Sequence, residues 1–187
     1  MLVHLAAFSQ DKDYIQNPTL GVHFFFNDFQ TASNIRNSSL SSTFRDKQFG
    51  KLKDMSPGLA INYMQGLNNN FDFSTSLAAS SVTYPIEHRP ELNDDGFLFE
   101  LDASIRGKMF SNKYWFIPYV QAGVGVSKFK GYYGAFIPVG LGIQINFFNE
   151  AYFLINSQYR VPVTQTANYH FFHSIGLAGN IGTRKPK

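Results

Sequence analysis

Two carboxylates, Glu100 and Asp102, lie two residues apart and would share one face of a β-strand. A pair of carboxylates on one face can perform the acid–base steps of a glycosidase. The same face carries Arg106, and a later segment with the same alternation carries Arg160. Because buried charges need partners of opposite sign, we favour an interior ion-pair network over a catalytic pair. Three glutamines are assigned to the same polar interior: Gln121, Gln144 and Gln158.

Other motifs that could do chemistry are incomplete. His170 and His173 have a spacing that resembles a metal pair, but residues three apart on a strand point to opposite faces. Residues 93–96 resemble a fragment of a calcium loop without its full ligand spacing, which favours a turn. The sequence contains neither a Gly-x-Ser-x-Gly elbow nor a phosphate-binding loop. We therefore expect no enzyme, no metal site and no cofactor.

Composition narrows the class of protein. Charged residues make up 16% of the 187 residues and aromatic residues 17%, while the mean hydropathy is −0.17. The aromatic content excludes intrinsic disorder, and the lack of any apolar run of about 18 residues excludes a helical membrane protein. With no cysteine, the chain has neither disulfides nor a cysteine zinc site. The net charge of +3 comes from scattered basic residues, so no nucleic-acid partner is expected.

The strongest pattern is alternation with a period of two. In residues 133–147 every odd position is apolar or aromatic, which indicates a long strand with two different faces. Seven more segments alternate in the same way, and no segment has a convincing helical pattern. The eight predicted strands lie within residues 20–27, 59–64, 71–80, 97–106, 120–127, 133–147, 153–160 and 174–180.

The connections between these strands also alternate in length. Short, Asn-bearing turns are expected at 66–70, 111–113 and 149–150. Longer connections lie between them, at 29–54, 85–96, 128–132 and 162–168. Short turns at one end and longer loops at the other are typical of an antiparallel up-and-down barrel and of transmembrane barrels. The predicted fold class is therefore all-β, an eight-stranded antiparallel up-and-down transmembrane β-barrel.

Three features favour an apolar face that points outward. The polar face is rich in glycine, which makes room in a narrow barrel, and it carries charges of both signs. Aromatic residues cluster near strand ends, where interfacial girdles lie. The predicted girdle comprises Phe110, Tyr114, Trp115, Phe147, Phe148, Tyr169 and Phe171, and the same clusters contain Phe116, Tyr132, Tyr133, Tyr152 and Phe172. A soluble lipocalin-like carrier with the faces reversed is the alternative.

Two prolines are difficult to fit into a continuous ladder of hydrogen bonds between strands. Pro118 and Pro138 fall within strand segments, and a closed barrel has no edge on which a missing N–H donor is tolerated. Pro118 fits near a strand start. Pro138 requires a bulge or a local break in pairing.

Residues 20–28, 54–63, 107–115 and 173–182 carry a family resemblance. In these stretches the chain resembles the N-terminal eight-stranded barrel of OmpA-family outer-membrane proteins. The resemblance covers nearly all of residues 14–183 and implies a structural role in the bacterial cell outer membrane. The barrel would anchor a cell-envelope protein and tether the membrane to peptidoglycan through a C-terminal domain that this sequence does not include.

The residues and the resemblance together set expectations for domains and partners. Residues 1–13 are interpreted as a signal-peptide remnant, 14–182 as the barrel, and 183–187 as the start of a periplasmic linker. Outer-membrane lipid, lipopolysaccharide and, during insertion, the barrel-assembly machinery are the expected partners. Four basic residues of the first long connection could contact lipopolysaccharide: Arg45, Lys47, Lys51 and Lys53. An adhesin or ligand receptor that acts through residues 29–54 is a further alternative.

Overall fold

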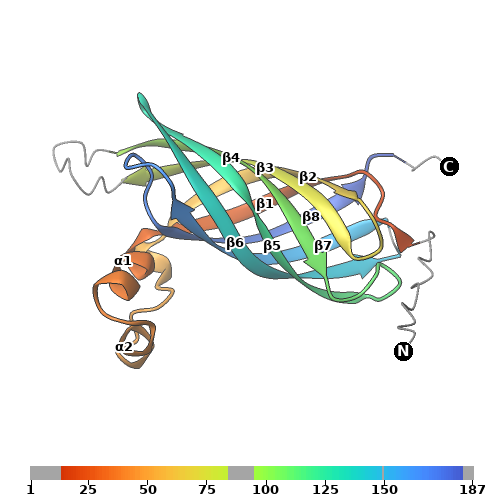
Figure 1. Cartoon of the computed structure of the whole chain (residues 1–187), viewed down its shortest axis with the longest axis horizontal. Coiled ribbons are helices and arrows are strands. Elements are labelled where there is room, and N and C mark those ends of the chain that lie inside the picture. The colour runs from red at the N-terminus through yellow and green to blue at the C-terminus, as the bar shows by residue number, and fades with distance from the viewer. Residues whose placement is uncertain (1–13, 84–94, 149, 183–187) are drawn as a thin grey trace, which may run out of the picture.

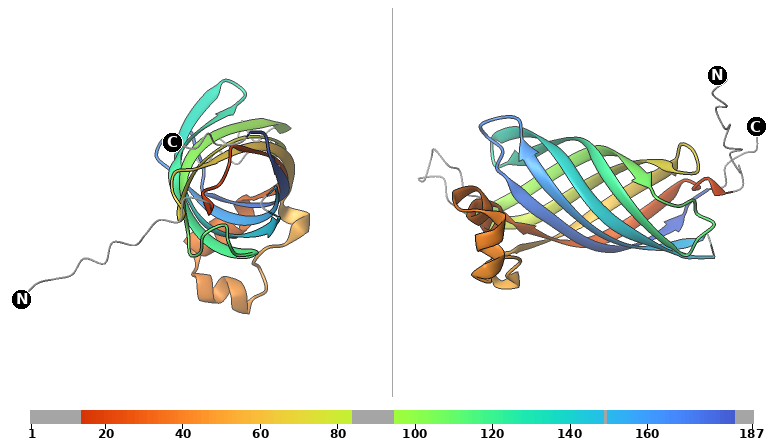
Figure 2. Two further views of the ribbon diagram at one scale, coloured as in Figure 1. Left: turned by 90° about the vertical axis from the view of Figure 1, so that its right-hand side faces the viewer. Right: turned by 60° about the horizontal axis from the view of Figure 1, so that its bottom comes forward.

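The computed structural model describes residues 14–83, 95–148 and 150–182. The predicted signal-peptide remnant (1–13), the predicted linker (183–187) and most of the 85–96 connection lie outside these residues. Eight antiparallel strands follow one another around a closed barrel, in which β1 also pairs with β8 (Figures 1 and 2). The strands are β1 (Thr19–Asp28), β2 (Ser56–Gly66), β3 (Phe71–Thr83), β4 (Asp95–Lys108), β5 (Phe116–Phe129), β6 (Tyr132–Phe147), β7 (Ala151–Pro162) and β8 (His170–Asn180). The predicted fold class is confirmed.

The two ends of the barrel differ as the connection lengths predict. The β2–β3, β4–β5 and β6–β7 turns lie at the end where β1 begins and β8 ends. The β1–β2 connection projects from the opposite end (Figure 1). We call these the turn end and the loop end. The strands have 10 to 16 residues, and a tilted strand needs about 9–11 to cross a bilayer.

The prediction of no helix is wrong for the β1–β2 connection. It contains α1 (Phe29–Asn37), α2 (Leu40–Arg45) and a short 3-10 helix, η2 (Leu52–Asp54). Capping residues start both α-helices: the Asp28 side chain accepts from the Thr31 N–H, and Ser39 and Ser42 form a capping box. These caps are local signals that strand alternation does not reveal. Among the described residues, no helix is long and apolar enough to span a membrane.

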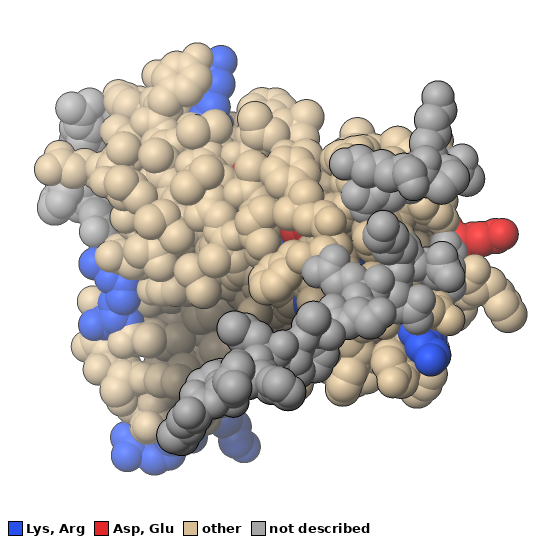
Figure 3. Space-filling view, turned by 45° about the vertical axis from the view of Figure 1, so that its right-hand side comes forward, with Lys and Arg blue, Asp and Glu red and all other residues tan. Residues whose placement is uncertain are grey.

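Apolar side chains cover the outside of the barrel. Along β5, Val120, Val124 and Val126 are more than half exposed, whereas Tyr119 and Gln121, on either side of Val120, point inward and are buried. On the face drawn in Figure 3, Lys, Arg, Asp and Glu gather toward the two ends, and the broad band between is almost entirely formed by other residues. This orientation is the opposite of the one that a soluble lipocalin-like carrier requires.

The inner face is packed by aromatic rings placed over glycines of the neighbouring strand. A Cβ on Gly142 would lie 2.4 Å from the Tyr119 ring, and one on Gly125 would lie 2.4 Å from the Phe136 ring. Real Cβ atoms do not approach so closely, so only glycine lets these rings lie flat against the wall. The interior glycines therefore make room for side chains, as a narrow eight-stranded barrel requires.

The two prolines are accommodated differently. Pro118 is the third residue of β5 and is paired with Ile143. At Pro138 the β5–β6 pairing is interrupted between Ala122↔Val139 and Gly125↔Phe136, and the register is the same on both sides. Of the two predicted solutions, the structure has the local break and not the bulge.

Candidate functional site

The charged interior of the barrel is the candidate site. Strand β4 turns alternate side chains inward, and these include Glu100, Asp102, Arg106 and Lys108. Their exposed fractions are only 1%, 4%, 1% and 4%. Charged groups this deeply buried must find partners within the wall of the barrel.

Arg160 of β7 is the centre of the ion pairs near the loop end. Its Nη1 lies 2.6 Å from Oε2 of Glu100, and its Nη2 lies 3.2 Å from Oδ2 of Asp102. The guanidinium carbon lies 3.9 Å from the centroid of the Phe172 ring, and Gln158 accepts from Arg160 Nε at 3.4 Å. One cation thus bridges two carboxylates while an aromatic ring covers its face.

Further polar groups complete both carboxylates. His170 Nε2 lies 3.3 Å from Oε1 of Glu100, and the amide of Asn27 donates to Oε2 of Glu100 at 3.5 Å. Ser76 donates to Asp102 at 2.6 Å and Ser104 donates to it at 3.3 Å. A carboxylate pair committed to an arginine and these donors is suited to holding the wall together, and it offers no free acid or base.

Arg106 does not join this cluster. It lies four residues beyond Asp102 on the same strand, which is roughly 13 Å along the strand. Its Nη1 contacts the Met64 sulfur, and its guanidinium carbon lies 3.7 Å from the centroid of the Tyr119 ring. The predicted pairing of Arg106 with Glu100 and Asp102 is therefore wrong. Alternation predicts the face on which a residue lies but not its level along the barrel.

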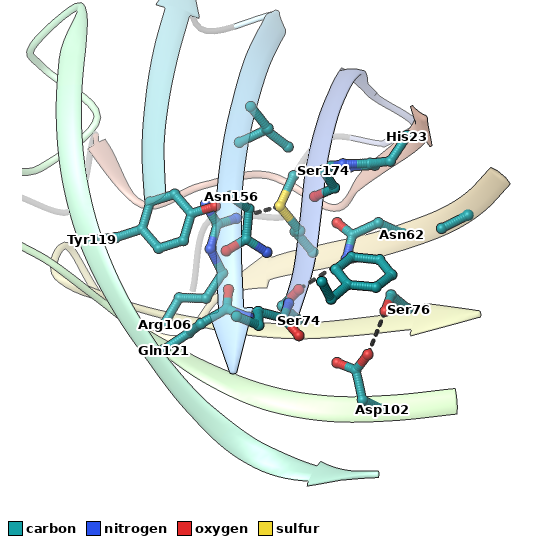
Figure 4. A pocket seen from close by; sticks show the side chains of 15 residues that line it. His23, Asn62, Ser74, Ser76, Asp102, Arg106, Tyr119, Gln121, Asn156 and Ser174 are labelled. Carbon is teal, nitrogen blue, oxygen red and sulfur yellow. Dashed lines mark hydrogen bonds between the residues drawn. The ribbon is translucent and has the colours of Figure 1, made fainter. Parts of the chain in front are cut away.

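A small cavity lies beside Arg106, at mid-height in the interior. Its volume is about 20 Å³, and Figure 4 shows Arg106, Tyr119, Gln121 and Asn156 converging on it. One bound water needs about 10–15 Å³, so the cavity has room for water but not for a metabolite. Gln121 therefore lines a polar pocket that water can bridge, and the interior contains no wide lumen at this level.

A second ion pair closes the turn end. Lys108 Nζ lies 2.9 Å from Oδ1 of Asp72, and it donates to Asn112 at 3.0 Å. Gln144 donates to Asn112 and to Asn146, which places it in this cluster and away from Arg160. The Asp72–Lys108 pair was not among the predicted site residues, although the inward alternation of Asp72 with Ser74 and Ser76 was visible in the sequence. Lys108 was missed because it follows Gly107, at the edge of the predicted strand.

The aromatic residues near the strand ends form two groups. Phe110, Tyr114, Trp115, Phe147 and Phe148 lie at the turn end, where all are exposed. Tyr169 and Phe171 lie at the loop end and are partly exposed, with Tyr159 packed on both. Tyr152 and Phe172, which the sequence pattern grouped with the girdle, point inward and are 1% and 3% exposed. Their position beside a strand end hides the fact that they belong to the inward set of alternate residues.

One serine–histidine contact lies on the outward face. Ser157 Oγ lies 2.9 Å from Nδ1 of His173, and the His173 ring stacks on Phe171. The structure also places His170 inward and His173 outward, as their spacing predicts. Ser157 is paired on one side with Leu141 and on the other with His173, so the nearby backbone N–H groups are committed to the sheet. Without free donors for an oxyanion, the contact satisfies two polar side chains and does not resemble a catalytic centre.

The four basic residues of the first connection are separate from the interior site. Arg45, Lys47, Lys51 and Lys53 are all exposed. Arg45 forms an ion pair with its neighbour Asp46 at 3.2 Å. These residues belong to the surface of the loop end.

The comparisons with known proteins agree with the barrel fold but match no family. No protein-family model and no curated protein matches the chain. Among solved structures, Neisserial surface protein A (NspA) aligns with a TM-score of 0.59 and 10% identity, over 89% of this chain and 99% of that one. The outer membrane protein OprG from Pseudomonas aeruginosa aligns with a TM-score of 0.57 and 11% identity, over 89% and 96%. Ail, the attachment invasion locus protein of Yersinia pestis, aligns with a TM-score of 0.50 and 12% identity, over 88% and 97%.

At these identities the similarity concerns the fold. The chain has the eight-stranded barrel fold that small outer-membrane proteins share. The narrower assignment to the OmpA family stays a prediction.

Proposed function

We propose that this chain is a structural β-barrel of the bacterial outer membrane that anchors a cell-envelope protein. The observation that carries the proposal is that charged side chains lie inside the barrel and apolar side chains outside, the reverse of a soluble protein. Arg160, Glu100 and Asp102 are buried inside, while Val124, Leu141 and Leu177 on the outside are 64–66% exposed. Water would penalise such an apolar outer surface, whereas lipid accepts it.

The closed sheet explains how the folded chain can span hydrocarbon. Hydrocarbon offers no partner for an unpaired N–H or C=O, so a β-sheet can cross a bilayer only when it has no open edge. The β1–β8 pairing runs from Thr19↔Asn180 to Asp28↔Phe171 and removes that edge. Outer-membrane lipid and lipopolysaccharide are the surroundings that we propose for this surface, and the barrel-assembly machinery is the proposed partner during insertion.

A filled interior supports an anchor in preference to a pore. Leu98, Val82 and Phe129 pack together under Phe29 at the loop end. At the turn end Gln16 is 1% exposed, and its backbone carbonyl accepts from the N–H of Gly66. Between them lie the two ion-pair clusters and the small cavity. A barrel packed in this way bears load without conducting ions.

Three measurements test this proposal: gel mobility, conductance and dispersity without detergent. The refolded chain is expected to run as a compact band on unheated SDS gels and to unfold to a slower band on boiling. In planar bilayers it is expected to give negligible conductance. Large, steady channels would contradict the filled interior, and a barrel that stays monodisperse without detergent would contradict the membrane assignment.

The tether to peptidoglycan is the finer part of the proposal. It derives from the OmpA resemblance and requires a periplasmic domain beyond the barrel. β8 ends at the turn end, which is the end that transmembrane barrels keep in the periplasm. A peptidoglycan-binding domain encoded after Lys187 would support the tether, and the native protein should then be retained by purified peptidoglycan sacculi. Failure of that retention would refute the tether and leave the membrane barrel standing.

A receptor or adhesin role is the second candidate. The observation that favours it is the helical β1–β2 connection, which projects from the loop end and exposes both apolar and basic side chains. Deletion of residues 30–53 and an assay of surface binding would separate this role from that of a pure anchor.

A further inference from the structure

The β1–β2 connection (residues 29–54), called here the helical loop, carries the excess charge of the protein. It contains five basic residues and two acidic ones, a difference of +3, which equals the net charge of the whole chain. The rest of the chain is therefore balanced, with 11 basic and 11 acidic residues. Lys47, Lys51 and Lys53 are exposed, and no ion pair in the described part of the chain involves them. This concentration of positive charge indicates a negatively charged partner.

The same loop exposes apolar side chains beside these charges. Leu40 and Phe44 are 52% and 55% exposed, and their spacing of four places them on one face of α2. Leu52 is 68% exposed between Lys51 and Lys53. Neighbouring apolar and basic groups are typical of a segment that lies at a membrane surface.

The loop lies beside the barrel, except that its first residue, Phe29, packs over the apolar cluster at the loop end. Figure 2 shows α1 and α2 outside the circle of strands when the barrel is viewed along its axis. Arg36 of α1 lies 4.1 Å from the centroid of the Tyr169 ring, and Phe49 lies 5.8 Å from that of Phe171. Phe49 in turn stacks on Phe44 at 4.5 Å. The apolar surface thus continues from the outer wall of β8 onto α2, at the level where the strands end.

We propose that the helical loop docks on the outer leaflet and binds the phosphate groups of its lipids. Phe44 and Leu40 enter the apolar boundary of that leaflet, and the three lysines contact phosphate groups around them. This inference rests on the proposed membrane insertion of the barrel. The occupants of the surface are lipids whose phosphate groups give the headgroup a net negative charge, because an anionic membrane meets both the basic side chains and the apolar face at this height.

Tryptophan quenching in vesicles tests the proposal. The single tryptophan, Trp115, lies at the turn end, so a Trp115→Phe, Phe44→Trp double variant reports on α2 alone. The variant is inserted into vesicles of phosphatidylcholine with or without phosphatidylglycerol, both brominated on the acyl chains. We expect strong quenching at position 44 with the anionic lipid and weaker quenching without it or in high salt. Each lysine near an anionic surface shifts the docked-to-undocked ratio by about fivefold, so Lys47→Gln, Lys51→Gln and Lys53→Gln together should lower it by roughly a hundredfold.

The control removes the same charge elsewhere. Lys113→Gln, Lys128→Gln and Lys130→Gln together change three lysines outside the helical loop and should leave the quenching unchanged. Equal quenching with and without phosphatidylglycerol, or equal effects of the two triple variants, would overturn the proposal. A response to soluble dextran sulfate without any response to anionic lipid would assign the surface to a soluble polyanion and would also overturn it.

Barrel insertion is measured separately, through the unheated gel band and through quenching of Trp115 in the parent protein. An inserted barrel with an unquenched residue 44 would refute the docking and leave the proposed function intact. Failure of both would refute the proposed function as well.

Discussion

Replacing Arg160 with methionine is the sharpest test of the interior network. The change keeps an unbranched side chain but removes the cation that lies 2.6 Å from Glu100 and 3.2 Å from Asp102. Both carboxylates stay buried, at 1% and 4% exposure, with no arginine to compensate them. Removal of one partner of a buried ion pair costs about 3–5 kcal/mol, so we expect the free energy of unfolding to fall by that amount.

A matched control exists on the surface. Arg45 also contacts a carboxylate at 3.2 Å, that of Asp46, but its side chain is 78% exposed. Exposed pairs contribute about 0–1 kcal/mol, so Arg45→Met should be nearly neutral. The comparison keeps the residue type and the 3.2 Å distance of one contact, while Arg160 is buried and bridges two carboxylates and Arg45 is exposed and contacts one.

The assay is urea unfolding of the refolded barrel in detergent micelles, followed through the fluorescence of Trp115. A second variant, with Arg160→Met, Glu100→Gln and Asp102→Asn combined, removes all three charges together. It should recover most of the lost stability, because neutral side chains do not carry the penalty of an unpaired charge. If Arg160→Met costs no more than Arg45→Met, the network does not stabilise the barrel and the reasoning is refuted.

Three further predictions concern the packing of the wall. Gly142→Ala should lower the free energy of unfolding by about 1–3 kcal/mol, because its Cβ would lie 2.4 Å from the Tyr119 ring. Gly107→Ala, whose Cβ would have its nearest neighbour at 3.5 Å, should cost far less, and equal costs in urea titrations would contradict the ring-over-glycine packing. Lys108→Met should lower stability by about 3–5 kcal/mol, and Lys108→Met with Asp72→Asn should restore most of it; a double variant no better than the single one would show that the 2.9 Å contact is not coupled. Phe148 has φ of 54° and is 96% exposed, so Phe148→Gly should raise stability in micelles by about 1–2 kcal/mol while Phe148→Ala should not; no difference between the two would argue against backbone strain at this turn.

The strand pattern of the sequence predicts the barrel because, in the middle of each strand, the two faces differ consistently in polarity. Along β6, odd positions such as Val139 and Leu141 face outward, and Gln144 and Asn146 face inward. The pattern loses its value at the strand ends. β5 begins at Phe116, four residues before the predicted start. The prediction begins too late because Ile117 and Tyr119 are apolar and aromatic residues that point inward, where the pattern expects polar ones.

The level of a side chain along the barrel could not be predicted either. Alternation assigns Arg106 and Arg160 to the same interior, but only the tilt and register of the strands bring Arg160 to Glu100 and leave Arg106 with Met64 and Tyr119. Helices α1 and α2 were missed for a different reason. They are short, they expose much of their surface, and they depend on the caps Asp28 and Ser39 more than on a buried apolar face.

Site-directed spin labelling tests the central claim, an apolar wall that faces lipid, most directly. The chain contains no cysteine, so single cysteines at Leu101, Leu141 and Gln165 can be labelled without other changes. In bilayers, labels at the outward positions 101 and 141 should collide readily with oxygen and rarely with a water-soluble nickel complex. The label at Gln165, exposed between β7 and β8, should show the reverse. Nickel accessibility at 101 and 141 as high as at 165 would place the apolar wall in water and contradict the membrane barrel.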